Sequence, residues 1–292
     1  MHRWQIVWQD SLLSITYDRA LPITNVFAPQ RNSHFEKTNL SYADSMRTLC
    51  ILALDILRSR AGDQSATTQL LQIVEYRDKL RDTTHRSSDY LQNLRSCRSM
   101  RDQLEYWNLL LHKSYITAEL CRPVLSHKRS TEPLVEALKQ TCIESLADTV
   151  EAWLGLQRIT KFAMYSWAGL HRALSSSLLL GLLGERANNA RIRRLLDELI
   201  AIMVDIISGL DPMDVGGPIA RSVEALQRLR LWEDRRERQR QEKLLDEMEE
   251  EGWTQFPSAS SEGSTPLLLR GTDASSPHAM VQAVLWGNEY SG

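Results

Sequence analysis

The chain has 292 residues, of which 42% are hydrophobic and 25% are charged, values close to the average for globular proteins. Its 35 basic and 37 acidic residues leave a net charge of −2, which excludes recognition of nucleic acid or an anionic membrane by an overall field. We therefore expect any partner to be recognised by a local surface, on a chain long enough for one large domain or two small ones.

The cysteines and the N-terminus indicate a reduced, intracellular protein without a membrane span. Four cysteines lie far apart and none belongs to a CxxC pair: Cys50, Cys97, Cys121 and Cys142. Gln9, Asp10 and Asp18 stand where a secretory signal needs an apolar segment, so we expect the cysteines to be small packing residues. The most apolar segment, 178–184, is far shorter than the roughly 20 residues that cross a bilayer.

The chain opens with a helical pattern that is apolar on most sides. One face of this helix, at spacings of three and four residues, carries Trp4, Trp8, Leu12 and Ile15. Ile6, Val7 and Leu13 lie on other faces, and a helix of this kind needs neighbours on most sides. Because ordinary N-termini are polar and frayed, we expect this chain to start inside a domain.

Amphipathic periodicity predicts further helices along most of the chain. The predicted segments run from Ser41 to Gly62 and over 64–83, 98–121, 132–159, 161–185 and 190–207. The Arg122-Pro123 step is expected to close or kink the helix over 98–121, because the residue before proline avoids the α region. Pro133 stands at the start of the next helix, where a missing N–H costs nothing. No alternating strand pattern occurs, so the predicted fold class is all-α.

The character of the chain changes after residue 210. A turn over 211–218 is followed by a long, mostly charged helix up to residue 251, and residues 252–292 are expected to be a disordered tail. Within this tail lies an apolar island at 276–290. Because such islands often dock onto a partner, its apolar side chains are candidate partner contacts: Val281, Val284, Leu285 and Trp286.

Motifs of catalysis and of metal or cofactor binding are not found in the sequence. It has no GxSxG, GxGxxG, Walker, HExxH or kinase signature, so no catalytic residues and no cofactor are expected. The best candidate metal cluster is His112, Cys121 and His127, but spacings of nine and six residues match no zinc module. Asp211, Asp214 and Glu198 could surround a cation, yet DPMDVGG is more simply a turn.

The run from Arg228 to Lys243 has seven basic residues in sixteen, enough to contact phosphates. Acidic residues interleave with them at helical spacing: Glu233, Asp234, Glu237 and Glu242. This interleaving is typical of an exposed helix stabilised by internal ion pairs, so we interpret the run as a solvated face.

Four stretches in order resemble the fungal-specific regulatory domain of Zn2Cys6 binuclear-cluster transcription factors. They are WQDSLLSITYDRA at 8–20, LCRPVLS at 120–126, FAMYSWAGLHRALSSSLLLGLLGE at 162–185 and SPHAMVQAVLWG at 276–287. The residues that carry the resemblance are expected to be structural: Trp8, Gln9, Asp10, Tyr17, Asp18, Arg19, Arg122, Pro123 and Trp167. Ala20 stands where the family often has proline.

The resemblance implies an all-α regulator of RNA polymerase II transcription that acts in the nucleus, or otherwise in the cytoplasm. In such factors a Cys-rich DNA-binding module precedes the regulatory domain, so residues 1–210 look like the C-terminal part of that domain. Zinc belongs to the N-terminal cluster, which this sequence lacks. The implied partners are the transcription machinery, other regulators, a second copy or full-length paralogues. DNA is reached only through them, and no membrane is involved.

Other functions are also compatible with the sequence. The chain could be a receptor whose helical core encloses a small apolar metabolite, with Trp107, Tyr115, Trp153 and Trp167 among the wall residues. It could be a truncated, DNA-binding-deficient form that competes with full-length factors. It could also be an incomplete reading of a longer gene, with no role of its own. A helical enzyme is the weakest alternative, because no acid, base or nucleophile pair stands out.

Overall fold

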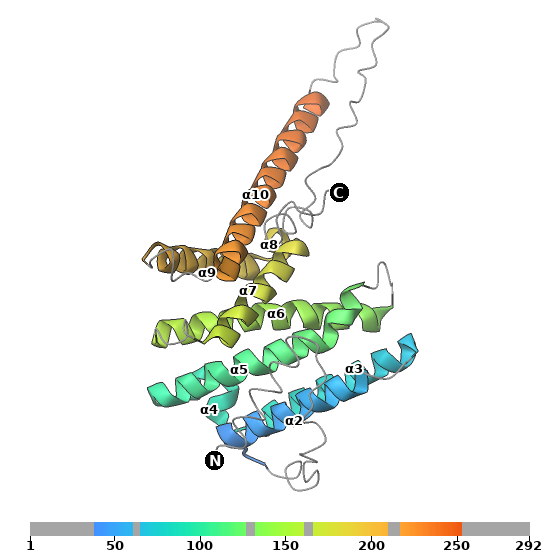
Figure 1. The fold of residues 1–292 in the computed structure, drawn as a ribbon. Coiled ribbons are helices and arrows are strands. Elements are labelled where there is room, and N and C mark those ends of the chain that lie inside the picture. Colours follow the sequence, from blue (N-terminus) through green and yellow to red (C-terminus); the bar gives the residue numbers. More distant parts are fainter. Residues whose placement is uncertain (1–37, 61–64, 127–131, 161–165, 210–216, 253–292) are drawn as a thin grey trace, which may run out of the picture. The chain divides into compact units, whose positions relative to one another are not determined.

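The computed structural model describes residues 38–60, 65–126, 132–160, 166–209 and 217–252, and in these residues every regular element is helical (Figure 1). The all-α class predicted from the sequence is therefore confirmed. The predicted opening helix, residues 211–216 of the predicted turn and the tail with its apolar island lie outside the described residues. Residues 217 and 218 of the predicted turn belong instead to the first turn of α10. The chain divides into two compact units, Met1–Ser177 and Leu178–Gly292.

The described part of the first unit contains four long helices and several short ones. They are α2 (Tyr42–Arg60), α3 (Ala66–His85), α4 (Asp89–Gln92), η2 (Leu94–Ser96), α5 (Met100–Cys121), η3 (Arg122–Ser126), α6 (Pro133–Ile159) and the first part of α7 (Trp167–Leu182). α2, α3, α5 and α6 agree with the predicted segments to within two residues. α7 begins at Trp167, after a non-helical Ser166, whereas the predicted segment begins at 161; residues 161–165 lie outside the described ranges. The elements α4 and η2 were not predicted, because a segment of one turn is too short to show a helical period.

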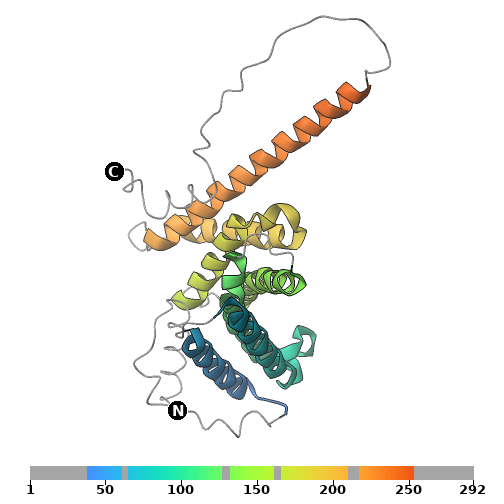
Figure 2. The same cartoon turned by 90° about the vertical axis from the view of Figure 1, so that its right-hand side faces the viewer.

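α5 is the central helix of the first unit and contacts α2, α3, α4 and α6 (Figures 1 and 2). Its contact with α6 is especially close at Gly155, where an added Cβ would lie 2.4 Å from the ring of Trp107. Only glycine leaves room for an indole ring at this position. The fully buried Trp153 and Leu154 complete this part of the core from α6.

Local capping explains where α5 begins and ends. The Ser99 hydroxyl accepts a hydrogen bond from the backbone N–H of Asp102 at 3.1 Å, and the Asp102 carboxylate accepts from the backbone N–H of Ser99 at 3.1 Å. This capping box starts the helix at Met100. The helix ends at Cys121, where the sequence predicted its end, and the 3-10 turn η3 begins at Arg122. The expected reason is wrong, because Arg122 adopts α-region angles (φ −51°, ψ −40°) directly before Pro123.

The second unit contains the end of α7, α8 (Glu185–Asn188), α9 (Ala190–Ser208) and α10 (Gly217–Gly252). α9 and α10 confirm the helices predicted over 190–207 and 219–251. α7 ends three residues before the predicted position, because Gly184 adopts a positive φ of 74° and starts the unpredicted turn α8. Leu178 and Leu182 pack against the buried Ala225 and Leu229 of α10.

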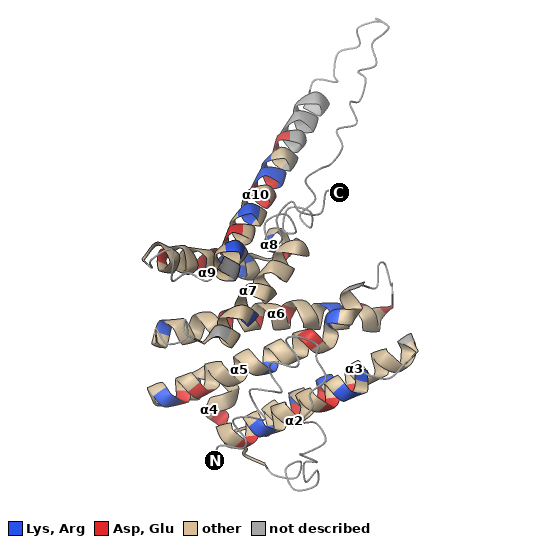
Figure 3. Cartoon of the chain, in the orientation of Figure 1, with Lys and Arg blue, Asp and Glu red and all other residues tan. Residues whose placement is uncertain are grey.

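α10 is the longest of the described helices, with 36 residues, and basic and acidic residues are interleaved along it (Figure 3). Its N-terminal part is packed, since Val223, Leu226 and Leu229 are buried. Its C-terminal part continues well beyond α9 (Figures 1 and 2).

The cysteines of the described residues have free thiols. Cys50, Cys121 and Cys142 are buried, which confirms a packing role for these three, whereas Cys97 is half-buried. Burial raises the pKa of Cys121 to about 11 and that of Cys142 to about 12, so both remain protonated and unreactive at neutral pH. None of the helices in the described ranges combines the length and apolar character needed to cross a membrane.

Candidate functional site

Most residues of the family motif lie outside the described part of the chain, as do the predicted partner contacts. This holds for Trp8, Gln9, Asp10, Tyr17, Asp18, Arg19, Val281, Val284, Leu285 and Trp286. Trp167 is the first residue of α7, and its side chain is not described. Arg122 and Pro123 are neighbours in η3, where Arg122 is exposed and pairs with Glu119 at 3.3 Å. Their role as parts of a structural motif remains a prediction.

The candidate metal clusters also fall partly outside the described ranges, which exclude His127, Asp211 and Asp214. His112 and Cys121 are both buried on α5. Among the described residues, no group of three His, Cys, Asp or Glu side chains is placed to hold a metal ion.

Three of the aromatic residues considered as walls of a receptor cavity belong to the core of the first unit. Trp107, Tyr115 and Trp153 are all buried. Their surroundings are not purely apolar, because the guanidinium of Arg172 lies 5.0 Å from the centre of the Tyr115 ring. A charged group therefore lies where the sequence indicated an apolar cavity.

Arg172, on α7, is a fully buried cation. Its Nη1 donates to Nδ1 of His112 at 2.5 Å, while Nε and Nη2 make no hydrogen bond. Burial lowers the pKa of Arg172 to about 10 and holds that of His112 well below its usual range. At neutral pH the guanidinium is thus charged and the imidazole neutral. Within the described ranges, no carboxylate pairs with it.

A second buried arginine, Arg186 on α8, has several carboxylate partners. Its Nη1 lies 2.6 Å from Oδ1 of Asp234, and its Nη2 lies 3.2 Å from Oδ1 of Asp197. Glu233 Oε2 is 3.7 Å from Nη1, too far for a hydrogen bond. Because these carboxylates come from α9 and α10, Arg186 connects three helices of the second unit.

These ion pairs correct the sequence interpretation of α10. Glu233 was expected on an exposed face, but it is only 6% exposed, and Asp234 pairs with Arg186 of α8. Glu237 pairs with Arg193 of α9 at 3.4 Å. The physical reason is that the buried stripe of α10 continues past Leu229 to the position four residues later. Glu242 is exposed, as predicted.

Glu233 is the unusual member of this group, because neither of its carboxylate oxygens accepts a hydrogen bond. Burial raises its pKa to about 7, an effect that the nearby Arg186 opposes and Asp234 reinforces. The side chain therefore changes charge near neutral pH.

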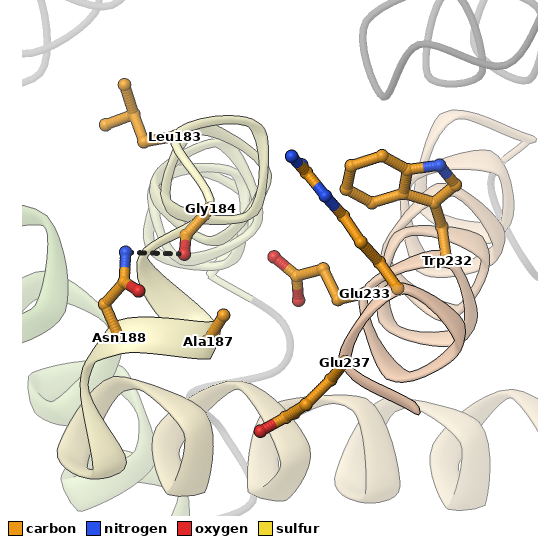
Figure 4. Close-up of a pocket in the computed structure, with 8 residues that line it drawn as sticks. Leu183, Gly184, Ala187, Asn188, Trp232, Glu233 and Glu237 are labelled. Atoms are coloured by element: carbon orange, nitrogen blue, oxygen red, sulfur yellow. Dashed lines mark hydrogen bonds between the residues drawn. The ribbon is translucent and has the colours of Figure 1, made fainter. Parts of the chain in front are cut away.

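A pocket of about 240 Å³ lies beside this carboxylate (Figure 4). Its lining residues are Leu183, Gly184, Ala187, Asn188, Trp232, Glu233, Arg236 and Glu237. Figure 4 shows Glu233 extending from α10 toward the turn that holds Gly184 and Ala187. No other residue lies within 4 Å of the position of a Cβ on Gly184, so this wall is open. The pocket thus combines an indole ring with a buried hydrogen-bond acceptor, which is the strongest candidate site in the described residues.

Sequence reasoning missed Arg172, Arg186 and Glu233, although two local signals were present. Arg172 stands in a segment that is apolar on nearly all sides, so its side chain could hardly avoid burial. Glu233 follows Leu226 and Leu229 at helical spacing. Neither signal identifies the partner residues.

The chain matches no protein-family model, no curated protein and no solved structure with which it was compared. The resemblance to fungal transcription-factor regulatory domains therefore stays a prediction from the sequence motifs.

Proposed function

We propose that this chain is a regulatory and interaction module of the fungal Zn2Cys6 transcription-factor type. It regulates RNA polymerase II transcription in the nucleus by binding other proteins, and it has no DNA-binding cluster, catalytic centre or cofactor of its own. The order of the four motifs supports this proposal, and the all-α fold is compatible with it.

The observation that carries the proposal is the length of α10 relative to its packed part. At about 1.5 Å per residue a helix of 36 residues is about 54 Å long, yet those of its described side chains that are buried lie between Val223 and Glu233. Beyond Glu237 the described side chains are exposed: Arg238, Gln239, Gln241 and Glu242. A helix that extends past its own core offers a polar surface to a partner protein.

Contacts within α10 help to keep this helix formed without a covering domain. Arg228 pairs with Glu224 one turn earlier at 2.6 Å. The Nε atoms of Arg235 and Arg238 donate to backbone carbonyls four residues earlier, at 3.2 Å in each case. Such contacts at i and i+4 stabilise exposed helices, so α10 can serve as a preformed binding element.

Interrupting the exposed part of α10 tests this function. The full chain is fused to a heterologous DNA-binding domain that controls a reporter gene. Gln241→Pro removes a backbone hydrogen bond and breaks the helix, whereas Gln241→Ala at the same exposed position preserves it. We expect reporter output to change several-fold with proline and to stay at the wild-type level with alanine. Equal output from both variants would argue against α10 as the interaction element.

The apolar island provides a separate test of the same function. Trp286→Ala is expected to change reporter output, because Trp286 is the largest apolar side chain of the proposed contact set. Trp253→Ala, at the other tryptophan that follows α10, is the matched control and should leave output unchanged. Circular dichroism should show that both variants retain the helical fold. Wild-type output from Trp286→Ala would remove the island from the proposal.

A further inference from the structure

We propose that the pocket beside Glu233 is a binding site for a small organic cation, an amine or guanidine whose N–H groups donate to the Glu233 carboxylate. This inference concerns a ligand site that the proposed interaction through α10 does not require. It would also give the second unit a way to respond to a metabolite.

The first argument is a buried acceptor that has no hydrogen bond. Glu233 is only 6% exposed, lines the pocket and accepts no hydrogen bond at either carboxylate oxygen. A buried carboxylate in this state is costly, and a ligand with N–H donors removes that cost. A neutral or anionic ligand that cannot donate leaves the carboxylate unpaired.

The second argument is the balance of charge around the pocket. Arg186 attracts the charge of Glu233 from 3.7 Å but does not hydrogen-bond to it, because it directs its N–H donors to Asp234 and Asp197. Arg193 directs its Nη2 toward Glu237 and the carbonyl oxygen of Ala187. The ionisable groups of α8, α9 and α10 in this region are three guanidinium groups and four carboxylates: Arg186, Arg193, Arg236, Asp197, Glu233, Asp234 and Glu237. When all are ionised, one negative charge is left for a ligand to neutralise.

The third argument is the aromatic wall. The guanidinium of Arg236 lies 5.2 Å from the centre of the Trp232 ring, so the face of this indole already attracts a planar cation. Arg236 is itself exposed and therefore able to move aside. The ring and the Glu233 carboxylate line the same pocket and together provide a stacking surface and an acceptor.

The size of the pocket and the lack of metal-ligand sets narrow the class of ligand further. A volume of about 240 Å³ is smaller than most ligand pockets, so it suits a small amine or guanidine better than a nucleotide. A metal ion is disfavoured, because no set of three His, Cys, Asp or Glu ligands exists in the described part of the chain. An organic cation with N–H donors can hydrogen-bond to a single carboxylate while it lies against the neighbouring ring.

Isothermal titration of the full chain with two probes tests the proposal. Agmatine represents a free metabolite, and N-acetyl-arginine amide represents an arginine side chain on a partner protein. We expect saturable binding of at least one probe. Tighter binding of agmatine points to a free small molecule, and tighter binding of the capped arginine points to a protein side chain; either result supports a cation site. The absence of saturable binding by both probes would overturn the proposal.

Two variants localise the binding, and a third controls for charge. Glu233→Gln keeps the shape but loses the charge, and should weaken binding at least tenfold. Ala187→Leu narrows the pocket from an exposed position of α8, and should weaken binding without removing any charge. Glu224→Gln removes a carboxylate elsewhere on α10, where Glu224 pairs with Arg228, and should bind like the wild type. Equal binding by all four proteins would contradict the site, whatever the outcome of the reporter experiments on α10.

Discussion

Arg172 in the first unit and Arg186 in the second are both buried, but their partners differ. Arg172 contacts the imidazole of His112 and the ring of Tyr115, and two of its nitrogens make no hydrogen bond. Arg186 instead directs its nitrogens to the carboxylates of Asp197 and Asp234. The buried charge of an arginine thus lacks a carboxylate partner among the described residues of one unit. In the other unit it pairs with carboxylates and connects three helices.

The difference shows that burial of a charge does not by itself indicate its contribution to stability. A buried cation without a carboxylate retains most of its desolvation cost, so its removal can stabilise a protein. When a buried cation pairs with carboxylates, its removal leaves them without a partner. Such a removal therefore lowers the free energy of unfolding. The two arginines should therefore respond to the same substitution with opposite signs.

The largest effect is expected for Arg186→Met. This substitution leaves the carboxylates of Asp197 and Asp234 without their cation. Because these carboxylates are 40% and 41% exposed and partly solvated, the loss should lie near the lower end for a buried pair, about 3 kcal/mol in the second unit. Urea unfolding followed by circular dichroism measures the loss, and amide hydrogen exchange should place it in α9 and α10. Arg228→Met is the matched control, because its pair with Glu224 is half-exposed, and it should cost less than about 1 kcal/mol. Similar losses in the two variants would remove the distinction between buried and exposed arginines.

The long helices could be predicted from the sequence because each repeats its apolar period over several turns. In α9, for example, Leu195, Leu199 and Met203 recur at spacings of four, and all three are buried. The single turns α4 and α8 could not be predicted, since four residues show no period. Local pattern is therefore sufficient for the helices but not for the short connections between them.

The candidate site was harder to predict than the helices. The interleaved charges of α10 indicated solvent, but Glu233 occupies a buried register position, and its cation comes from α8. Pairing between residues far apart in the chain is a tertiary property that periodicity in one segment cannot supply. The pocket depends on this pairing, because Arg186 is used by Asp234 and Asp197 and leaves Glu233 without a hydrogen bond.

The next largest effect concerns the pH dependence of Glu233. Burial raises its pKa from 4.5 to about 7 in the folded chain; Arg186 and Arg193 oppose this shift, and Asp234 and Asp197 reinforce it. The folded chain therefore binds the proton more tightly than the unfolded chain, and stability falls as pH rises from about 4.5 to about 7. Glu233→Gln should lack this fall and be more stable above pH 7 by about 2 kcal/mol, because water in the open pocket screens part of the effect.

The measurement is the difference in unfolding free energy between wild type and Glu233→Gln at pH values from 4.5 to 8. Other titrating groups are common to both proteins and largely cancel in this difference. A difference that does not vary with pH would show that Glu233 titrates at its ordinary value. In that case the contrast between Arg172 and Arg186 would stand, but Glu233 would no longer be a carboxylate whose pKa is raised by burial beside Arg186.

Arg172→Met should have the opposite sign to Arg186→Met. It removes a buried cation that no carboxylate of the described residues compensates, although it also takes a donor away from His112. We expect a net gain in stability of about 1 kcal/mol, and a larger gain when His112→Leu is added, because no buried polar group then remains at that contact. Arg172→Lys keeps the charge and should give no gain. A loss of stability in Arg172→Met would mean that the guanidinium contributes favourably and would end the contrast between the units.

The smallest effect is expected within the second unit, at the pair of Arg193 and Glu237. This pair spans 3.4 Å, but its side chains are 39% and 43% exposed, so water screens the attraction. A double-mutant cycle with Arg193→Met and Glu237→Gln should give a coupling energy of about 0.2–1 kcal/mol. A coupling energy comparable with the effect of Arg186→Met would mean that distance alone, and not burial, decides how strongly carboxylates hold these helices together. A small value leaves burial as the property that separates Arg186 from the other arginines of α8 and α9.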